Sequence, residues 1–201
     1  LRRFLMLRQR CFDMRDIASG VQGKTAAQAR TLDRRKVKIV ETVWDESLRQ
    51  GGAVLAQQTD IALAHVKGDW AIYLQADEVL HEDDHPAIRR ALDRCQDDPR
   101  VEGLLLSYKH FYGSYGYVGC SRRWYRSEVR IVRPRVPGLR SWKDAQGFRA
   151  ADRKLRVILC DATVYHYGWV TSPRHQQAKQ QSFNRLWHSD TWVNAAVGNG
   201  V

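Results

Sequence analysis

The chain has 201 residues, of which 43% are hydrophobic, and a formal net charge of +11. This length allows one domain with a real core, and the hydrophobic fraction excludes a disordered chain. No apolar run approaches the ~18 residues that a membrane span needs, and no signal peptide is visible, so we expect no transmembrane segment.

The charge is divided into three blocks along the chain. Residues 1–38 carry a net charge of +8, residues 69–98 carry −6, and residues 122–156 carry +9. An acidic block between two basic ones suits a site that holds a cation and a polyanionic ligand together. It equally suits an ordinary solvated surface.

The four cysteines are widely and irregularly spaced, and no two of them form a CxxC pair. We therefore interpret Cys11, Cys95, Cys120 and Cys160 as reduced thiols of a cytoplasmic protein rather than as zinc ligands. The spacing leaves disulfide pairing open as an alternative.

The first half of the chain contains the clearest periodic patterns. Residues 1–32 are basic and have no clear period, and we predict helix or irregular structure there. Val37–Glu41 is rich in β-branched residues and predicts a strand. Ala53–Lys67 has apolar residues at helical spacing. Trp70–Leu74 is a nearly continuous apolar run, which is typical of a strand buried on both faces.

The second half adds further strands and two helices. Pro86 suits the first turn of a helix that runs to about Cys95, and Val101–Tyr108 predicts a second buried strand. A proline after a serine predicts a helix from residue 173 to about 188. Three more strands are expected at Glu128–Arg133, Leu155–Leu159 and Thr163–His166. The order predicts an α/β sheet that is mainly parallel at its start.

One carboxylate follows the buried strand directly. Asp77 comes three residues after Trp70–Leu74, at the end where open α/β sheets bind ligands. A carboxylate in that place can hold a divalent cation, which in turn neutralises a diphosphate. The alternative is an acid that caps an ordinary turn after the strand.

Several short stretches match one known pattern when they are taken together in order. They are Trp44-Asp45-Glu46, Gln57–Leu63, Gly68-Asp69-Trp70, Gln75–Glu78, Asp144–Arg149 and Tyr165–Trp169. On these stretches, residues 33–190 resemble the family 2-type glycosyltransferases with the GT-A fold. The resemblance implies a GT-A-like (Rossmann-like) mixed sheet flanked by helices. It divides the chain into a divergent basic segment, residues 1–32, and a glycosyltransferase-like domain, residues 33–201.

The resemblance implies an enzyme that moves a sugar from a nucleotide-sugar donor to a hydroxyl acceptor with inversion, assisted by Mn or Mg. In that family an Asp-x-Asp-like motif ends the strand, and its last Asp binds the metal with the diphosphate. Here Gln75 stands in place of the first Asp, so Asp77 takes that role with Glu78 beside it. His166 is the implied second metal ligand, since a neutral imidazole binds Mn well. The alternative for His166 is a histidine that is satisfied within the core.

Other residues are assigned to the substrates. Asp144 is the candidate general base that takes the proton of the acceptor hydroxyl, and its alternative role is to cap a turn. Gln58 and Asp60 are expected near the donor. Arg149, Arg130 and Arg133 are candidates for pairing with its phosphates, and simple surface exposure is the alternative for most of this Arg-rich segment.

The resemblance also implies an N-terminal nucleotide-binding part that residues 1–32 do not display. We expect that part to be truncated or rewritten upstream of about residue 30 and the isolated chain to bind nucleotide sugars weakly or not at all. Two other functions stay open: an inactive glycosyltransferase fragment, and a nucleic-acid-binding protein, which the basic aromatic stretch Arg122–Arg126 allows. The acidic block argues against a nucleic-acid partner, which we do not expect.

Overall fold

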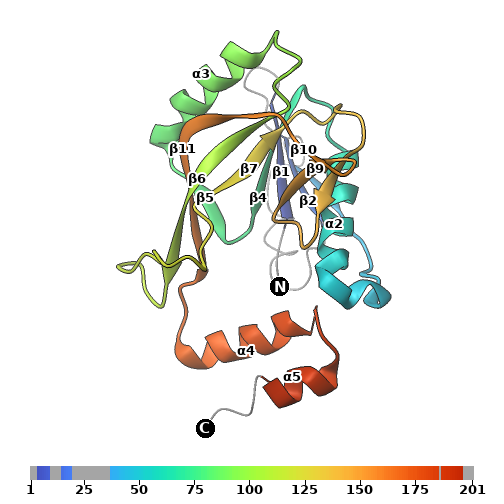
Figure 1. The fold of residues 1–201 in the computed structure, drawn as a ribbon, viewed down its shortest axis with the longest axis vertical. Helices are drawn as coiled ribbons and strands as arrows, with labels where there is room; N and C mark the ends of the chain where they lie inside the picture. Colours follow the sequence, from blue (N-terminus) through green and yellow to red (C-terminus); the bar gives the residue numbers. More distant parts are fainter. Residues whose placement is uncertain (1–3, 10–14, 20–36, 186, 197–201) are drawn as a thin grey trace.

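The computed structural model describes residues 4–9, 15–19, 37–185 and 187–196. They form a mixed α/β fold in which helices flank a strongly curved mixed sheet (Figure 1). Within these ranges no helix is long and apolar enough to cross a membrane. The expected α/β class with a mixed sheet is confirmed.

The main sheet has eight strands in the order β3-β2-β1-β4-β7-β6-β11-β5. Its strands are β1 (Phe4–Gln9), β2 (Arg15–Ser19), β3 (Val37–Val40), β4 (Trp70–Gln75), β5 (Glu78–Leu80), β6 (Gly103–Tyr112), β7 (Ser127–Val132) and β11 (Val157–Trp169). The pairs β2/β3 and β6/β11 are parallel, and the other neighbouring pairs are antiparallel. A separate antiparallel sheet consists of β8 (Leu139–Trp142), β9 (Gly147–Ala150) and β10 (Arg153–Lys154).

The helices cover the sheet and one end of the molecule (Figure 1). They are η1 (Glu46–Gly52), α2 (Ala53–Ala64), η2 (Glu82–Asp84), α3 (His85–Cys95), α4 (Pro173–Asn184) and α5 (Asp190–Ala196). α3 buries Ile88, Ala91, Leu92 and Cys95, a spacing of three and four residues that places one apolar face on the sheet. α4 and α5 lie together beyond the end of β11.

Strand β4 separates two hydrophobic clusters. Trp70, Ile72 and Leu74 pack in one cluster with α3, β6 and β11, whereas Ala71 and Tyr73 pack in the other with α2. Alternate side chains of a strand point to opposite faces, so both faces of β4 are covered. The expectation of a strand buried on both faces is therefore confirmed.

The predicted strand at Val37–Glu41 and the predicted helix at Ala53–Lys67 correspond to β3 and α2. The two strands predicted at Leu155–Leu159 and Thr163–His166 are one strand, β11, whose pairing with β6 shifts in register between them. The prediction was wrong in splitting β11, because the irregularity interrupts its hydrophobic alternation without ending the strand.

The N-terminal segment contains strands, which corrects the prediction of helix or irregular structure. Residues 4–9 and 15–19 form β1 and β2, while residues 10–14, including Cys11, and residues 20–36 lie outside the described part. β1 is antiparallel to both β2 and β4, so the start of the sheet is not mainly parallel as expected. Pairing with β1 satisfies backbone groups of β4 that would otherwise lie at an open edge.

Candidate functional site

The candidate site lies where β4, β6 and β11 end at the same edge of the sheet. β4 ends at Gln75, and a turn through Asp77 leads into β5, where Glu78 lies opposite His166 of β11. The backbone N–H of Tyr167 donates to the carbonyl of Asp77 at 2.8 Å. The pairing of β5 with β11 thus holds the Asp77 turn beside the end of β11.

The structure brings the two predicted metal ligands, Asp77 and His166, together. Oδ2 of Asp77 lies 3.7 Å from Nε2 of His166, and their side chains are 26% and 10% exposed. That separation is too long for a hydrogen bond. It is within the span that two ligand atoms bridge when each lies about 2.0–2.2 Å from one ion.

A contact with His110 determines which nitrogen of His166 carries its proton. Nδ1 of His110 is 3.0 Å from Nδ1 of His166, and Nε2 of His110 is 3.0 Å from the carbonyl oxygen of Tyr125. Because a carbonyl only accepts, a neutral His110 carries its proton on Nε2 and accepts at Nδ1. Nδ1 of His166 is then the donor, and a neutral His166 turns the lone pair of Nε2 toward Asp77. Burial and the neighbouring His166 lower the pKa of His110, which favours its neutral form.

Gly168 leaves a space between Asp77 and His166. A Cβ atom at this position would lie 2.6 Å from Nε2 of His166 and closer still to Oδ2 of Asp77. A carboxylate oxygen and the lone pair of an imidazole nitrogen are donor atoms that a divalent cation such as Mn²⁺ binds. In the described ranges no group of three or more His, Cys, Asp or Glu side chains could hold a metal ion.

Lys179 of α4 reaches the same point, although no motif indicated it. Its Nζ donates to the carbonyl of Gly168 and lies 3.4 Å from Oδ2 of Asp77. The ammonium also lies 5.4 Å from the centre of the Trp169 ring. Lys179 therefore pairs with Asp77 and supplies a positive charge beside it.

A buried ion pair lies next to these residues. Nη2 of Arg130 donates to Oε1 of Glu78 at 2.8 Å, and neither side chain has exposed surface. The hydroxyl of Tyr108 donates to the same carboxylate at 3.0 Å and accepts from Nε of Arg130. Burial alone would lower the pKa of Arg130, but Glu78 and Tyr108 keep it well above its usual value. Arg130 is thus paired inside the protein, which corrects the expectation that it binds a phosphate or lies at the surface.

Asp144, the predicted general base, is buried in the turn between β8 and β9. Lys143 and Ala145 on either side of it have φ of 52° and 63°, in the left-handed region that such residues seldom adopt. Nε2 of Gln146 donates to Oδ2 of Asp144 at 3.0 Å, and the carbonyl of Gln146 accepts from Nη1 of Arg130 at 2.7 Å. Backbone conformations of this kind persist where surrounding contacts hold them and concentrate at functional sites.

Asp144 and Arg149 line a pocket of about 440 Å³. The guanidinium of Arg149 lies 4.6 Å from the ring centre of Trp142, and burial raises the pKa of Glu128 in the same pocket. Asp77 and His166 do not line it, so among the described residues the structure does not bring the base and the metal ligands into one pocket.

The two remaining donor-side candidates make their contacts with the protein. Gln58 on α2 is fully buried and accepts from the hydroxyl of Thr42. Oδ1 of Asp60 accepts from the backbone N–H of Ser141 at 2.6 Å, and burial raises the pKa of Asp60. These contacts attach α2 to its surroundings, and a role of either side chain in donor binding stays a prediction.

The sequence matches no protein-family model, and a search of curated proteins finds no match.

Proposed function

We propose that the protein is a glycosyltransferase that moves a sugar from a nucleotide-sugar donor to a hydroxyl acceptor, with inversion, on a GT-A-type fold. The proposal is carried by one observation: Asp77 and His166 face each other across the space beside Gly168 at the strand ends. Open α/β sheets bind ligands at that edge, where the chain leaves the carboxyl ends of its strands.

The chemistry assigns a task to each group. Oδ2 of Asp77 and Nε2 of His166 would hold a divalent cation, which would neutralise charge on the donor diphosphate. The ammonium of Lys179 pairs with a phosphate oxygen. Asp144 accepts the proton of the acceptor hydroxyl as its oxygen forms a bond to the anomeric carbon. The bond from that carbon to the diphosphate breaks, and the diphosphate leaves with the electron pair.

The strand order supports the fold part of the proposal and also limits it. The sequence β3-β2-β1-β4 is the order found in doubly wound nucleotide-binding sheets. In those sheets the strands are parallel, whereas β1 here is antiparallel to β4. We therefore expect the chain to bind the nucleotide weakly, since the usual floor for the base is altered.

The test is calorimetric titration with a panel of UDP-, GDP- and ADP-sugars, with and without Mn²⁺. We expect weak binding by at least one donor only when Mn²⁺ is present, and its loss in Asp77→Asn. Asp83→Asn is the matched control, because Asp83 belongs to the same acidic stretch and its side chain is 89% exposed. Binding that depends neither on Mn²⁺ nor on Asp77 would refute the proposal. The absence of Mn²⁺-dependent binding even at millimolar donor would also refute it.

A nucleic-acid-binding function has less support. Sequence-independent binding of single strands needs aromatic rings that are free to stack on bases. The ring of Tyr125 instead packs against the rings of His110 and Tyr108, at 4.5 and 4.9 Å between ring centres. A salt-sensitive affinity for oligonucleotides, without binding of nucleotide sugars, would favour that function over the enzyme.

A further inference from the structure

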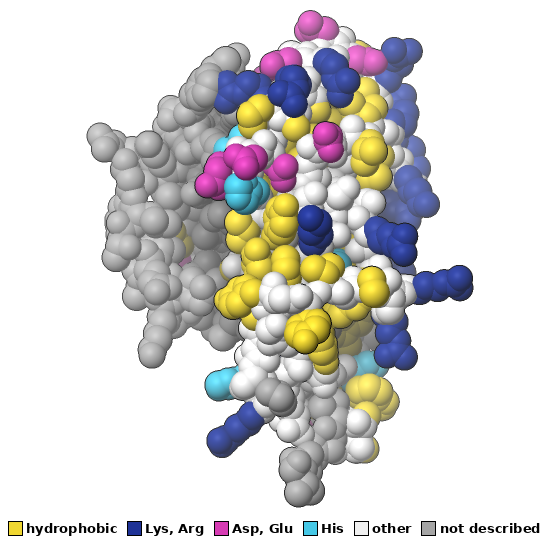
Figure 2. Space-filling view, turned by 90° about the vertical axis from the view of Figure 1, so that its left-hand side faces the viewer, with side chains coloured by type: hydrophobic (Ala, Val, Ile, Leu, Met, Phe, Trp, Pro, Cys, Tyr) yellow, Lys and Arg dark blue, Asp and Glu magenta, His cyan; other side chains and the backbone are white. Residues whose placement is uncertain are grey.

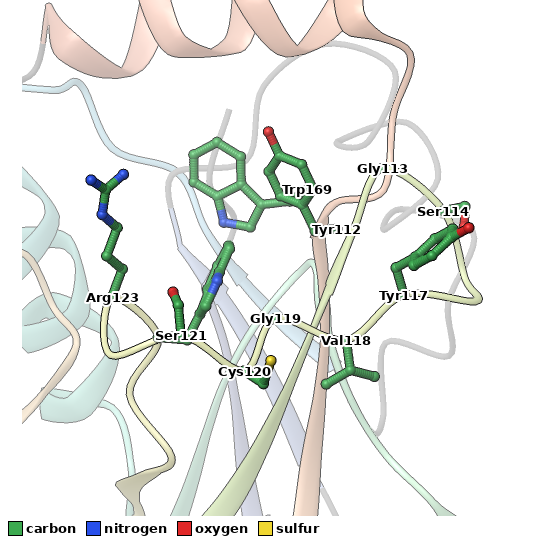
Figure 3. A pocket seen from close by; sticks show the side chains of 11 residues that line it. Tyr112, Gly113, Ser114, Tyr117, Val118, Gly119, Cys120, Ser121, Arg123 and Trp169 are labelled. Carbon is green, nitrogen blue, oxygen red and sulfur yellow. The ribbon is translucent and has the colours of Figure 1, made fainter.

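A second, larger pocket of about 880 Å³ lies between the β6–β7 connection and the end of β11 (Figure 3). Its walls include the rings of Tyr112, Trp124 and Trp169. The Trp124 ring lies 6.1 Å from each of the other two, at interplanar angles of 66° and 78°. Arg123 and Ser121 add polar groups to the lining. The volume is in the range of sites for small organic ligands.

This aromatic pocket adjoins the candidate metal ligands. Lys179 connects them on one side, because its ammonium lies over the Trp169 ring and beside Oδ2 of Asp77. His110 connects them on the other side, since its ring is 5.0 Å from both Trp124 and His166. A ligand in the pocket is therefore separated from Asp77 and His166 by single side chains.

The pocket offers apolar ring faces that are partly in water. Tyr112 is 46% and Tyr117 is 74% exposed, and Figure 2 shows hydrophobic side chains gathered at the centre of the face on this side of the molecule. Large exposed apolar patches of this kind mark binding sites. A ligand that covers these rings gains the free energy of burying them.

The charges around the rings select the kind of ligand. A cationic ligand is disfavoured, because Arg123 lines the pocket and the ammonium of Lys179 already lies over Trp169. A pyranose ring suits the arrangement well. Its C–H face packs against an aromatic ring, whose face is negative, and its hydroxyls pair with the guanidinium of Arg123 and the hydroxyl of Ser121.

We propose that this pocket is the acceptor subsite and that it binds a neutral or anionic hexopyranoside stacked on Trp124 or Trp169. This inference rests on the proposed function, because the transfer needs an acceptor. Asp144 lines the other pocket and not this one, so the stacked ring is a part of the acceptor that lies away from the reacting hydroxyl. The inference adds the substrate class, a sugar, and the residues that recognise it.

The test uses protein in which the tryptophans are replaced by 5-fluorotryptophan. The probes are the methyl glycosides of glucose, galactose, mannose and N-acetylglucosamine, methyl glucuronide, and choline as the cation. We expect at least one glycoside, at millimolar concentration, to shift the fluorine signals of Trp124 and Trp169. These two signals are assigned by their disappearance in Trp124→Phe and Trp169→Phe. The signal of Trp192 on α5, which is 45% exposed and lies outside the pocket lining, serves as the control and does not shift.

Two milder variants keep the test valid if a tryptophan change disturbs the fold. Tyr117→Ala, at a mostly exposed position, weakens glycoside binding about threefold or more, and Arg123→Ala weakens methyl glucuronide more than the neutral glycosides. No shift with any glycoside, or a shift with choline alone, overturns the proposal. If nucleotide sugars bind with Mn²⁺ and no glycoside binds, only the acceptor subsite is wrong. If a glycoside binds and no nucleotide sugar does, the sugar pocket stands and the glycosyltransferase proposal fails.

Discussion

Replacing His110 by Phe removes a hydrogen-bond partner of His166 and keeps the rest of the site in place. A phenyl ring preserves the contacts of the His110 ring with Trp124 and Tyr108, at 5.0 and 5.3 Å between ring centres. It can neither accept from Nδ1 of His166 nor donate to the carbonyl of Tyr125. His110→Gln is the matched variant, because its amide can make both hydrogen bonds.

The expected effect follows from what the substitution leaves behind. In His110→Phe the Nδ1–H of His166 loses its acceptor in a nearly buried position, which costs about 1–3 kcal/mol. The proton then moves to Nε2, the atom that faces Asp77, and Mn²⁺ binding at that nitrogen requires the proton to return to Nδ1. Loss of a partner that orients a metal-ligating histidine typically weakens metal binding 10- to 100-fold, or about 1.4–2.7 kcal/mol.

Two measurements examine this reasoning. Long-range ¹H–¹⁵N spectra of the metal-free protein report the tautomer of His166, and we expect its proton on Nδ1 in the original protein and in His110→Gln. Titration of Mn²⁺ followed by electron paramagnetic resonance gives the affinity, which falls in His110→Phe and is largely restored in His110→Gln. A proton on Nε2 of His166 in the original protein would falsify the assignment. Equal Mn²⁺ affinity in all three proteins would show that His110 does not position His166.

Three further changes have expected outcomes. Gly168→Ala places a methyl group in the space between the two ligands and lowers Mn²⁺ affinity by about tenfold or more, with unchanged near-ultraviolet circular dichroism; unchanged affinity would mean that the ion does not bind there. Arg130→Met leaves Glu78 charged and unpaired and lowers the free energy of unfolding in urea by about 3–5 kcal/mol. The double variant Arg130→Met/Glu78→Gln should lose less free energy of unfolding than Arg130→Met alone, and an equal loss in the two variants would contradict the pairing. Arg153 holds the pKa of Glu102 at about 2, below its usual 4.5, so this carboxylate stabilises the fold above pH 4.5 by at most about 3 kcal/mol and loses that effect as the pH falls toward 2. Glu102→Gln should flatten the pH dependence of urea unfolding in that window, and an unchanged slope would refute the assignment.

Strand β4 and helix α2 could be predicted because the spacing of hydrophobic residues within each segment is enough to identify it. The apolar run of β4 and the helical period of α2 each identify one element without reference to partners. β1 and β2 could not be found in this way, since a strand in a basic segment depends on pairing with β4. The short strands β8, β9 and β10 depend in the same way on pairing with one another.

The sequence could identify the residues of the candidate site that lie at the end of a single predicted strand. It could not identify those that reach the site only through the pairing of two strands. Asp77 follows β4 directly, and His166 lies near the end of β11, so both could be named from the sequence. His110 meets His166 only because β6 and β11 pair in parallel with these residues in register. The alternation of Leu104, Leu106, Tyr108 and His110 along β6 is a period-two signal that could have placed His110 on the inner face.

The ion pair of Arg130 and Glu78 also bears on how the protein folds. Its partners are 52 residues apart, the two imidazoles are 56 apart, and Lys179 is 102 residues from Asp77. Contacts of such large sequence separation require long loops to close and form slowly. The polar centre should therefore assemble after the helices and the local strand pairs. In refolding from urea, far-ultraviolet circular dichroism should recover before the capacity to bind Mn²⁺.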